Sequence, residues 1–188
     1  LGDGDSAGTR FTIADEALVT AVHDGADTFG HFVHAHTAPN RCPTYAIVSQ
    51  RGTGGRPINR FLDALRSLEL IGNKHIPSRY SRNDRTTRLQ LLAGLIDSDG
   101  AKNNHGLIFY NTNQRLAEET TWLCRSLGLR AQCTPYQWSL TRQGETKTGT
   151  GYKVTIGGAL STIPTRLTRK QQPDSVQRRS NRTAFRVV

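Results

Sequence analysis

Three features of the sequence predict an α+β fold made of two similar halves. Helical and strand-like periodicities both occur along the chain, so it contains both kinds of element. Their order, helix-strand-(helix)-strand-strand-helix, is found twice with little identity between the copies. Asp3 and Asp99 are 96 positions apart, and so are Lys74 and Lys170. We therefore expect two packed copies of one unit about a pseudo-twofold axis.

The first half is predicted from alternating apolar positions and from residues that begin or end helices. Acids in the first turn begin one helical pattern, and Gly30 ends it. Pro57, a residue type common at the first position of a helix, begins a leucine-rich pattern that Gly72 closes. We expect a strand at residues 10–13, a helix at 15–29, paired strands at 31–37 and 44–50, and a helix at 57–70.

The second half repeats this pattern after a polar, basic connector at residues 78–85. Gly128 ends its central helix, as Gly30 ends the corresponding helix of the first half. Pro164 limits or kinks the last helix. We expect a helix at 86–97, a strand at 107–113, a helix at 114–127, strands at 129–139 and 152–156 joined by a polar loop, a short helix at 159–167, a polar basic tail at 169–182 and the start of a strand at 185–188.

The composition indicates a polyanionic partner. Lys and Arg number 25 against 15 Asp and Glu, which gives a net charge of +10. This balance favours nucleic acid first and an anionic membrane surface second. A length of 188 residues is enough for one domain or two small ones. No run approaches the roughly 20 apolar residues of a membrane span, so we expect no membrane partner.

The cysteines Cys42, Cys124 and Cys133 are odd in number and form no C-x-x-C motif. Neither a disulfide framework nor a zinc finger is indicated, and we expect an intracellular setting, the nucleus if the host is eukaryotic.

The sequence contains no Met and no signal peptide. We expect the chain to be a piece of a longer polypeptide.

Residues 91–100, Leu-Leu-Ala-Gly-Leu-Ile-Asp-Ser-Asp-Gly, are the most distinctive stretch. On a helix, Gly94 and Ser98 lie on one face, where another backbone can approach closely. Asp99 then lies at the end of the helix. An apolar helix of this kind is ordinarily core, but core helices rarely end in Asp-Ser-Asp-Gly.

Asp3 and Asp99 are candidate ligands of a divalent cation. If the pseudo-twofold axis brings both helix ends together, the two carboxylates repel each other unless a cation offsets their charge. Mg²⁺ favours few carboxylates together with water and phosphate oxygens, which suits a phosphodiester substrate. The alternative is that each Asp-Gly pair forms a simple turn. A calcium loop that starts at Asp97 is excluded, because its twelfth position is Ile108, where a bidentate Glu is needed.

Lys74 and Lys170 are candidate catalytic residues. An ammonium group near a metal-bound water can orient that water, lower its pKa or stabilise the extra charge of the transition state. The alternative is that both are ordinary surface lysines.

Basic residues on and between the expected strands are candidate phosphate contacts, and alternating polar positions on a strand ribbon suit base edges in the major groove. Each is individually more often a solvated side chain. His34 and His36 share a face of their strand and His31 does not, which favours DNA contact or plain exposure over metal binding. The candidate DNA-binding residues are Arg51, Arg56, Arg79, Arg82, Arg130, Lys153 and Arg169.

Several of these segments resemble one protein family. Residues 92–100 resemble the second LAGLIDADG block of intein-encoded homing endonucleases, with Ser98 in place of Ala. Residues 1–4, Leu-Gly-Asp-Gly, look like the end of the first block. Residues 73–77, Asn-Lys-His-Ile-Pro, are similar to the segment before the second block in fungal-type inteins, including the vacuolar-ATPase intein. Residues 163–170 look like the family segment that carries the second lysine.

The resemblance implies the LAGLIDADG homing endonuclease fold, a pseudo-twofold pair of αββαββα subdomains whose saddle-shaped antiparallel sheets straddle duplex DNA. It implies that Asp3 and Asp99 bind Mg²⁺, for which Mn²⁺ substitutes, and that Lys74 and Lys170 are catalytic. The expected subdomains are residues 1–85, with the first signature helix truncated, and residues 86–175, followed by a tail at 176–188 toward a splicing domain.

The function that the resemblance implies is a site-specific endonuclease region of an intein, which makes a Mg²⁺-dependent double-strand break in an intein-free allele and so drives homing. The expected partners are double-stranded DNA and the splicing domain of the parent intein, and the expected state is a monomer with an internal pseudo-dimer. Two alternatives stay open: a LAGLIDADG module that binds nucleic acid without cutting it, like a maturase or a decayed endonuclease, and a structural remnant of an intein. The chain has no Cys or Ser at its start and no terminal His-Asn, so we do not expect it to splice.

Overall fold

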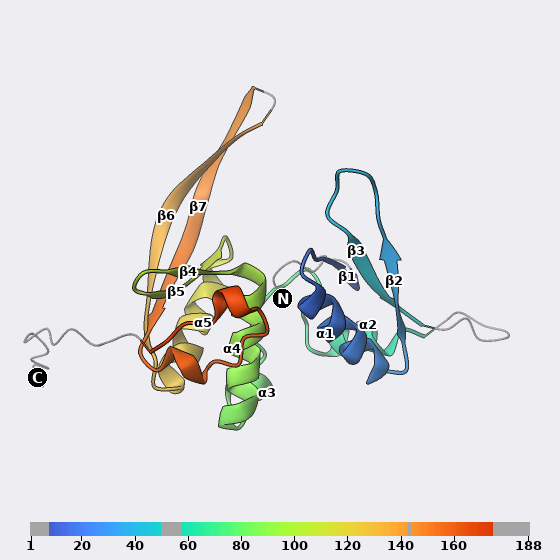
Figure 1. Ribbon diagram of the computed structural model, residues 1–188, viewed down its shortest axis with the longest axis horizontal. Helices are drawn as coiled ribbons and strands as arrows, with labels where there is room; N and C mark the ends of the chain where they lie inside the picture. The colour runs from blue at the N-terminus through green and yellow to red at the C-terminus, as the bar shows by residue number, and fades with distance from the viewer. Residues whose placement is uncertain (1–7, 50–57, 143, 175–188) are drawn as a thin grey trace, which may run out of the picture.

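The computed structural model describes residues 8–49, 58–142 and 144–174, which form two halves that stand side by side (Figure 1). The first half contains β1 (Arg10–Thr12), α1 (Glu16–Asp27), β2 (Phe32–His36), β3 (Thr44–Val48) and α2 (Arg60–Ser67). The second contains α3 (Ser78–Ser81), α4 (Arg85–Asp99), β4 (Gly100–Asn103), β5 (Gly106–Asn111), α5 (Gln114–Ser126), β6 (Arg130–Arg142), β7 (Glu145–Gly157) and the 3-10 turns η1 (Leu160–Thr162) and η2 (Thr168–Lys170).

Each half is built on one antiparallel sheet. The first sheet has the strand order β1-β3-β2, and the second has the order β4-β5-β7-β6. The hairpins β2–β3 and β6–β7 project to the same side of the molecule, above the helices in Figure 1. The α+β class with antiparallel sheets is therefore confirmed. The boundary between subdomains at residue 85 stays a prediction, although α4 begins at that residue.

The main core lies in the second half, where α4 and α5 cover one face of the sheet. Leu92 and Ile96 of α4 are fully buried against Phe109 and Val154, which are cross-strand partners on β5 and β7. Because neighbouring positions of a strand point to opposite faces, Tyr110 and its partners lie on the face away from these helices. That face carries Arg130, Gln132, Thr134, Tyr136, Trp138, Lys153 and Thr155, together with Tyr110.

The β6–β7 hairpin is longer than the sequence indicates, with 13 residues in each strand. The polar loop expected after Ser139 is instead a continuation of the ladder. Its glycines leave room for aromatic rings from the opposite strand: a Cβ on Gly149 would lie 2.6 Å from the Trp138 ring, and a Cβ on Gly151 would lie 2.7 Å from the Tyr136 ring. The glycines thus indicate close packing within a ribbon rather than a turn.

Three other elements differ from expectation. β4 was not predicted, because no element was expected between residues 97 and 107, but it pairs with β5. The helix expected at 159–167 is only the turn η1 followed by extended backbone, in line with Pro164, which has no N–H to donate. The connector contains the short helix α3. The strand start expected at 185–188 lies outside the described residues.

A groove of about 600 Å³ separates the two halves. Gly94 and Ser98 of α4 line one side of it, and Phe11 and Leu18 of the first half line the other. The small residues of α4 therefore face the other half, but no described atom lies within 4 Å of a Cβ added at Gly94, so the expected close approach of another backbone is not seen among the described residues. No helix in the part of the chain that the structure describes is long and apolar enough to cross a membrane.

Candidate functional site

Asp99 is the last residue of α4, and the chain continues directly into β4. Asp84 begins the helix, because its carboxylate accepts a hydrogen bond from Thr87 N at 2.9 Å. At the other end, a Cβ on Gly100 would lie 2.6 Å from the carbonyl oxygen of Ile96, so only glycine allows this abrupt change from helix to strand. The glycine of the signature thus has a structural role next to the acid.

Lys170 is buried, and its ammonium group lies at the carboxyl end of α4. Nζ donates hydrogen bonds to the carbonyl oxygens of Ile96 (2.8 Å), Asp97 (2.6 Å) and Ser98 (3.2 Å). Burial lowers the pKa of Lys170, and the neighbouring Arg169 charge lowers it further. The structure therefore brings Lys170 to the helix end that carries Asp99, where it binds backbone oxygens.

Asp97 is a site residue that the sequence reasoning missed. Its side chain is buried, and its carboxylate accepts hydrogen bonds from Arg166 N (2.8 Å) and Leu167 N (3.2 Å). These bonds hold the segment that leads to Lys170 against α4. The sequence did contain a signal, which is an acid on the buried side of an apolar helix. Such an acid requires hydrogen-bond donors from another segment of the chain.

Lys74 lies in a segment that is fixed to α5 of the second half. Its carbonyl oxygen accepts a hydrogen bond from Asn113 Nδ2 at 2.8 Å. Two residues later, Ile76 N donates to Glu119 Oε2 at 2.6 Å. The Lys74 segment, which ends the first half, therefore docks on the second half close to Asn111, whose Nδ2 lies 3.5 Å from Asp99 Oδ2.

Asn111 and Asn113 are two further residues that sequence reasoning missed. Asn111 ends β5, and Asn113 is the N-cap of α5. The signal was an Asn-Thr-Asn run between a strand and a helix, but Asn is so common at helix N-caps that this run alone does not indicate a functional site.

The candidate DNA-binding residues are spread over different surfaces. Lys153 lies on the sheet face away from the helices, paired with Tyr110 and Thr134. Arg79 and Arg82 lie at α3, at the opposite end of the molecule from the hairpins (Figure 1). Arg169 binds Asp15 of the first half through both of its terminal nitrogens, Nη2 at 2.8 Å. The contact of these residues with DNA stays a prediction.

Asp3, Arg51 and Arg56 lie outside the described residues, so their predicted roles are not addressed by the structure. The histidines behave as the strand pattern indicates. His34 and His36 are exposed on one face of β2, whereas His31 is buried and its Nε2 accepts a hydrogen bond from Arg60 N at 2.9 Å.

The donor set around Asp99 fits a divalent cation held by few protein ligands. Among the described residues there is no group of three or more His, Cys, Asp or Glu that could surround a metal ion. Asp99 nevertheless offers the hard carboxylate oxygen that Mg²⁺ prefers, and Mg²⁺ commonly keeps water and phosphate oxygens at its other positions. Asp99 thus has the chemistry to hold such an ion, and this role stays a prediction.

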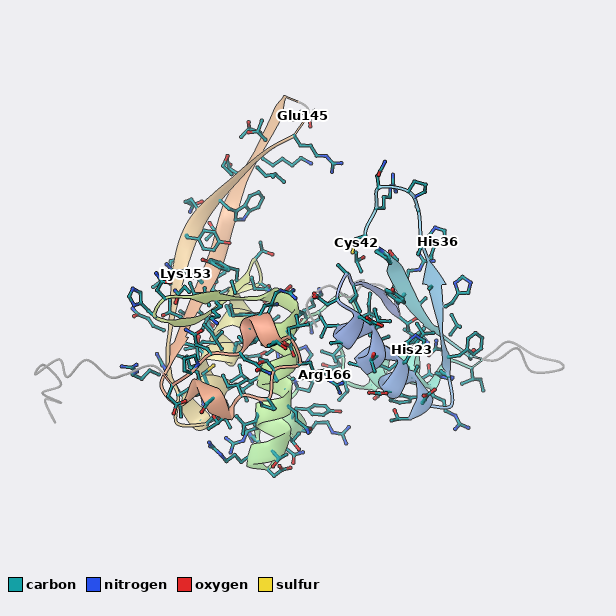
Figure 2. The ribbon with its side chains drawn as sticks, viewed as in Figure 1. His23, His36, Cys42, Glu145, Lys153 and Arg166 are labelled. Carbon is teal, nitrogen blue, oxygen red and sulfur yellow. The ribbon has the colours of Figure 1, made fainter. Side chains whose placement is uncertain are left out.

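Two contacts between charged groups join the halves next to this site. Arg169 of η2 binds Asp15 at the start of α1, and Arg166 Nη1 lies 3.8 Å from Asp24 Oδ2. In Figure 2, Arg166 extends from the last described segment into the space between the halves, on the side of α1. The hydrogen bond from Arg169 lowers the pKa of Asp15.

Comparison with known proteins gives one family. The family described as homing endonuclease matches residues 75–173 of the chain. A curated relative, described as the replicative DNA helicase DnaB of Mycobacterium intracellulare, is 33% identical over 133 residues, which make up 70% of this chain and 18% of the relative. The chain thus spans about a fifth of the length of the curated relative that it matches.

Solved structures of the homing endonuclease I-DmoI share the fold. Its mesophilic variants superpose with a TM-score of 0.52 at 14% identity, over 82% of this chain and 78% of theirs. A variant in complex with its target DNA in the presence of Mn gives 0.51 at 15% identity, over 79% and 70%. I-DmoI in complex with DNA and Ca gives 0.50 at 13% identity, over 79% and 67%.

Proposed function

We propose that this chain, which belongs to the homing endonuclease family, is the part of a site-specific nuclease that binds double-stranded DNA and cuts both of its strands. The single observation that carries the proposal is the arrangement at the end of α4. There Asp99 is the last residue of the helix, and Lys170 binds the last carbonyls. Asn111, next to Asp99, and Asn113, which binds the Lys74 carbonyl oxygen, connect the Lys74 segment to this place.

The surface also suits a duplex. Both hairpins project to one side, and the sheet face away from the helices carries Lys153 among polar and aromatic side chains (Figure 2). A net charge of +10 favours a phosphate backbone. The solved structures of I-DmoI with DNA provide the precedent for a duplex on this fold.

The residues of the site would have separate roles. Asp99 would hold a divalent cation, with Mg²⁺ as the proposed ion and Mn²⁺ as its substitute. When bound, that ion supplies positive charge at the scissile phosphate and lowers the pKa of a bound water. Lys170 fixes the end of α4 and so the position of the Asp99 carboxylate, and Lys74 would supply a second positive charge near the reacting phosphate. Asp3 is the proposed second acid.

The curated relative supports an intein context. It is described as a helicase, yet the segment that it shares with this chain overlaps a homing endonuclease region, and that segment is only 18% of its length. An endonuclease region inserted in a host protein, which is the arrangement of an intein, reconciles the two descriptions. The resemblance to fungal-type inteins and the splicing domain as a partner stay predictions.

The experiment uses the intact polypeptide that carries this chain and DNA spanning the host gene without the insertion. We expect a double-strand break in Mg²⁺ or Mn²⁺ at one position, and DNA affinity that falls steeply as salt is raised. Binding without cleavage in either metal would favour the alternative, a nucleic-acid-binding module that does not cut. Affinity that is independent of salt would contradict a DNA partner.

A further inference from the structure

Asn113, at the junction of β5 and α5, joins three parts of the site. Its Oδ1 accepts a hydrogen bond from Leu116 N (3.1 Å) and so caps α5. Its Nδ2 donates to the Lys74 carbonyl oxygen (2.8 Å), and its backbone N donates to Asn111 Oδ1 (2.9 Å). Because Asn111 Nδ2 lies 3.5 Å from Asp99 Oδ2, a chain of contacts runs from the carboxylate of Asp99 to the main chain of Lys74.

Capping of α5 explains only one of these contacts. Asp and Ser are as common as Asn at this position of a helix. A carboxylate, however, has no N–H to donate, and a serine hydroxyl is shorter than an amide. The amide of Asn113 therefore has a second use, which is to hold the Lys74 segment against the start of α5.

The first half has a counterpart of this arrangement. Asp15 is the N-cap of α1 and lies 98 positions before Asn113, the same separation as between Gly30 and Gly128. Asp15 makes no side-chain capping bond to α1. Its carboxylate instead accepts hydrogen bonds from the guanidinium of Arg169, the residue next to Lys170.

In each half, then, the N-cap of the central helix binds the lysine-bearing segment that comes from the other half. The chemistry differs, since one contact is amide to carbonyl and the other is carboxylate to guanidinium, but the topology is the same. The Asn113 contact is thus one of two equivalent places where the halves are joined next to a lysine-bearing segment.

We propose that Asn113 is a positioning residue, which places Lys74 relative to Asp99 of the opposite half. This inference rests on the proposed function, because it assigns Asn113 to the proposed cutting centre at the end of α4. In this proposal Asn113 does not itself touch the reacting phosphate. Loss of its contact shifts the Lys74 segment, and a displacement of about 1 Å in a catalytic arrangement can cost up to a hundredfold in rate.

The test uses Asn113→Asp and Asn113→Ser in the intact protein. The two Asn113 variants keep a capping oxygen and lose the amide donor, one with and one without an added charge. Single-turnover cutting of each strand is followed on end-labelled DNA, DNA affinity is measured in EDTA, and thermal unfolding is recorded. We expect cutting of one strand to slow by on the order of tenfold, with affinity unchanged, so that nicked DNA accumulates.

Only the strand that is cut at the Asp99 centre is expected to be slow, because the Asn113 contact holds the Lys74 segment next to that centre. A purely structural role would slow both strands alike. Asn59 provides the matched control: its Oδ1 caps α2 through Leu62 N (3.0 Å), and its Nδ2 donates to Ile47 O (2.9 Å) in the first sheet, away from either lysine. Asn59→Asp and Asn59→Ser are expected to cut both strands at the rate of the wild-type protein.

Asn113 variants that match the Asn59 variants, or that slow both strands equally, would overturn this inference and leave the proposed nuclease function intact. A wild-type protein that leaves both strands uncut would overturn the proposed function and this inference with it.

Discussion

Lys170 and Asp97 are two charged side chains whose partners at the end of α4 are backbone atoms. The last four carbonyls of a helix have no partner within the helix, and their partial negative charge attracts a cation. Lys170 Nζ binds three of them, and Asp97 accepts two backbone N–H groups from the segment that carries Lys170. Each buried charge is therefore hydrogen-bonded, and the two together fasten the last segment of the fold to the helix that positions Asp99.

Lys170→Met tests this contribution, because methionine keeps much of the volume and removes all three donors. We expect the free energy of unfolding to fall by about 1.5–3 kcal/mol, the usual range for hydrogen bonds to a charged group. Lys102→Met, on the exposed edge strand β4, is the control and is expected to change it by less than about 0.5 kcal/mol. Urea unfolding measures both, and equal stability of the two variants would contradict the assigned role.

The junction between α4 and β4 determines where Asp99 lies. The strand begins at the residue after the helix, so the backbone turns within one position. Gly100 permits this turn by allowing the strand to pass close to the last turn of the helix, where Ile96 O lies 2.6 Å from the place of a Cβ.

Gly100→Ala is expected to displace the start of β4 and lower the thermal unfolding midpoint by several degrees, as a cost of about 1–3 kcal/mol implies for overpacking at a closely packed site. Gly25→Ala, in the last turn of α1 with no atom within 4 Å of an added Cβ, is expected to raise the midpoint, because alanine favours helix. A midpoint that rises in both variants would show that the junction has room for a side chain.

The sequence predicts some elements well because their signals are local. Apolar periodicity and capping residues predict α4 and α5 to within two residues of their observed ends. The length of the β6–β7 hairpin was not predictable, since its threonines and glycines are also typical of loops, and only pairing with Trp138 and Tyr136 makes it a ribbon. The contacts that complete the site depend on residues far apart in sequence, such as Asn113 with Lys74, and these have no local signature.

At the scale of the whole molecule, two contacts between charged groups join the halves beside the groove that Gly94 and Ser98 line. Arg169 binds Asp15 through two hydrogen bonds, and this geometry is more specific than a single ion pair. The relative placement of the two sheets, and so the width available to a duplex, depends in part on this contact.

The free energy of unfolding, measured as a function of pH in the acid range, is expected to depend on the Asp15–Arg169 contact. The hydrogen bond from Arg169 holds the pKa of Asp15 below its ordinary value of 3.8, so the folded protein releases this proton more readily than the unfolded chain does. The stabilisation is complete above pH 3.8 and is lost as the pH falls through the lower, folded-state pKa. In Asp15→Asn, the free energy of unfolding should depend less on pH in this acid range. An unchanged pH dependence in this range would contradict the contact.

Cleavage by Asp99→Asn is the most direct test of the central claim that the end of α4 is a cutting centre. The matched control is Asp84→Asn at the other end of the same helix, where Asn caps as well as Asp. In Mg²⁺, we expect Asp84→Asn to make the double-strand break at the rate of the wild-type protein, and Asp99→Asn to make none while binding DNA with undiminished affinity in EDTA. A double-strand break by Asp99→Asn at the wild-type rate would contradict the assignment of this site.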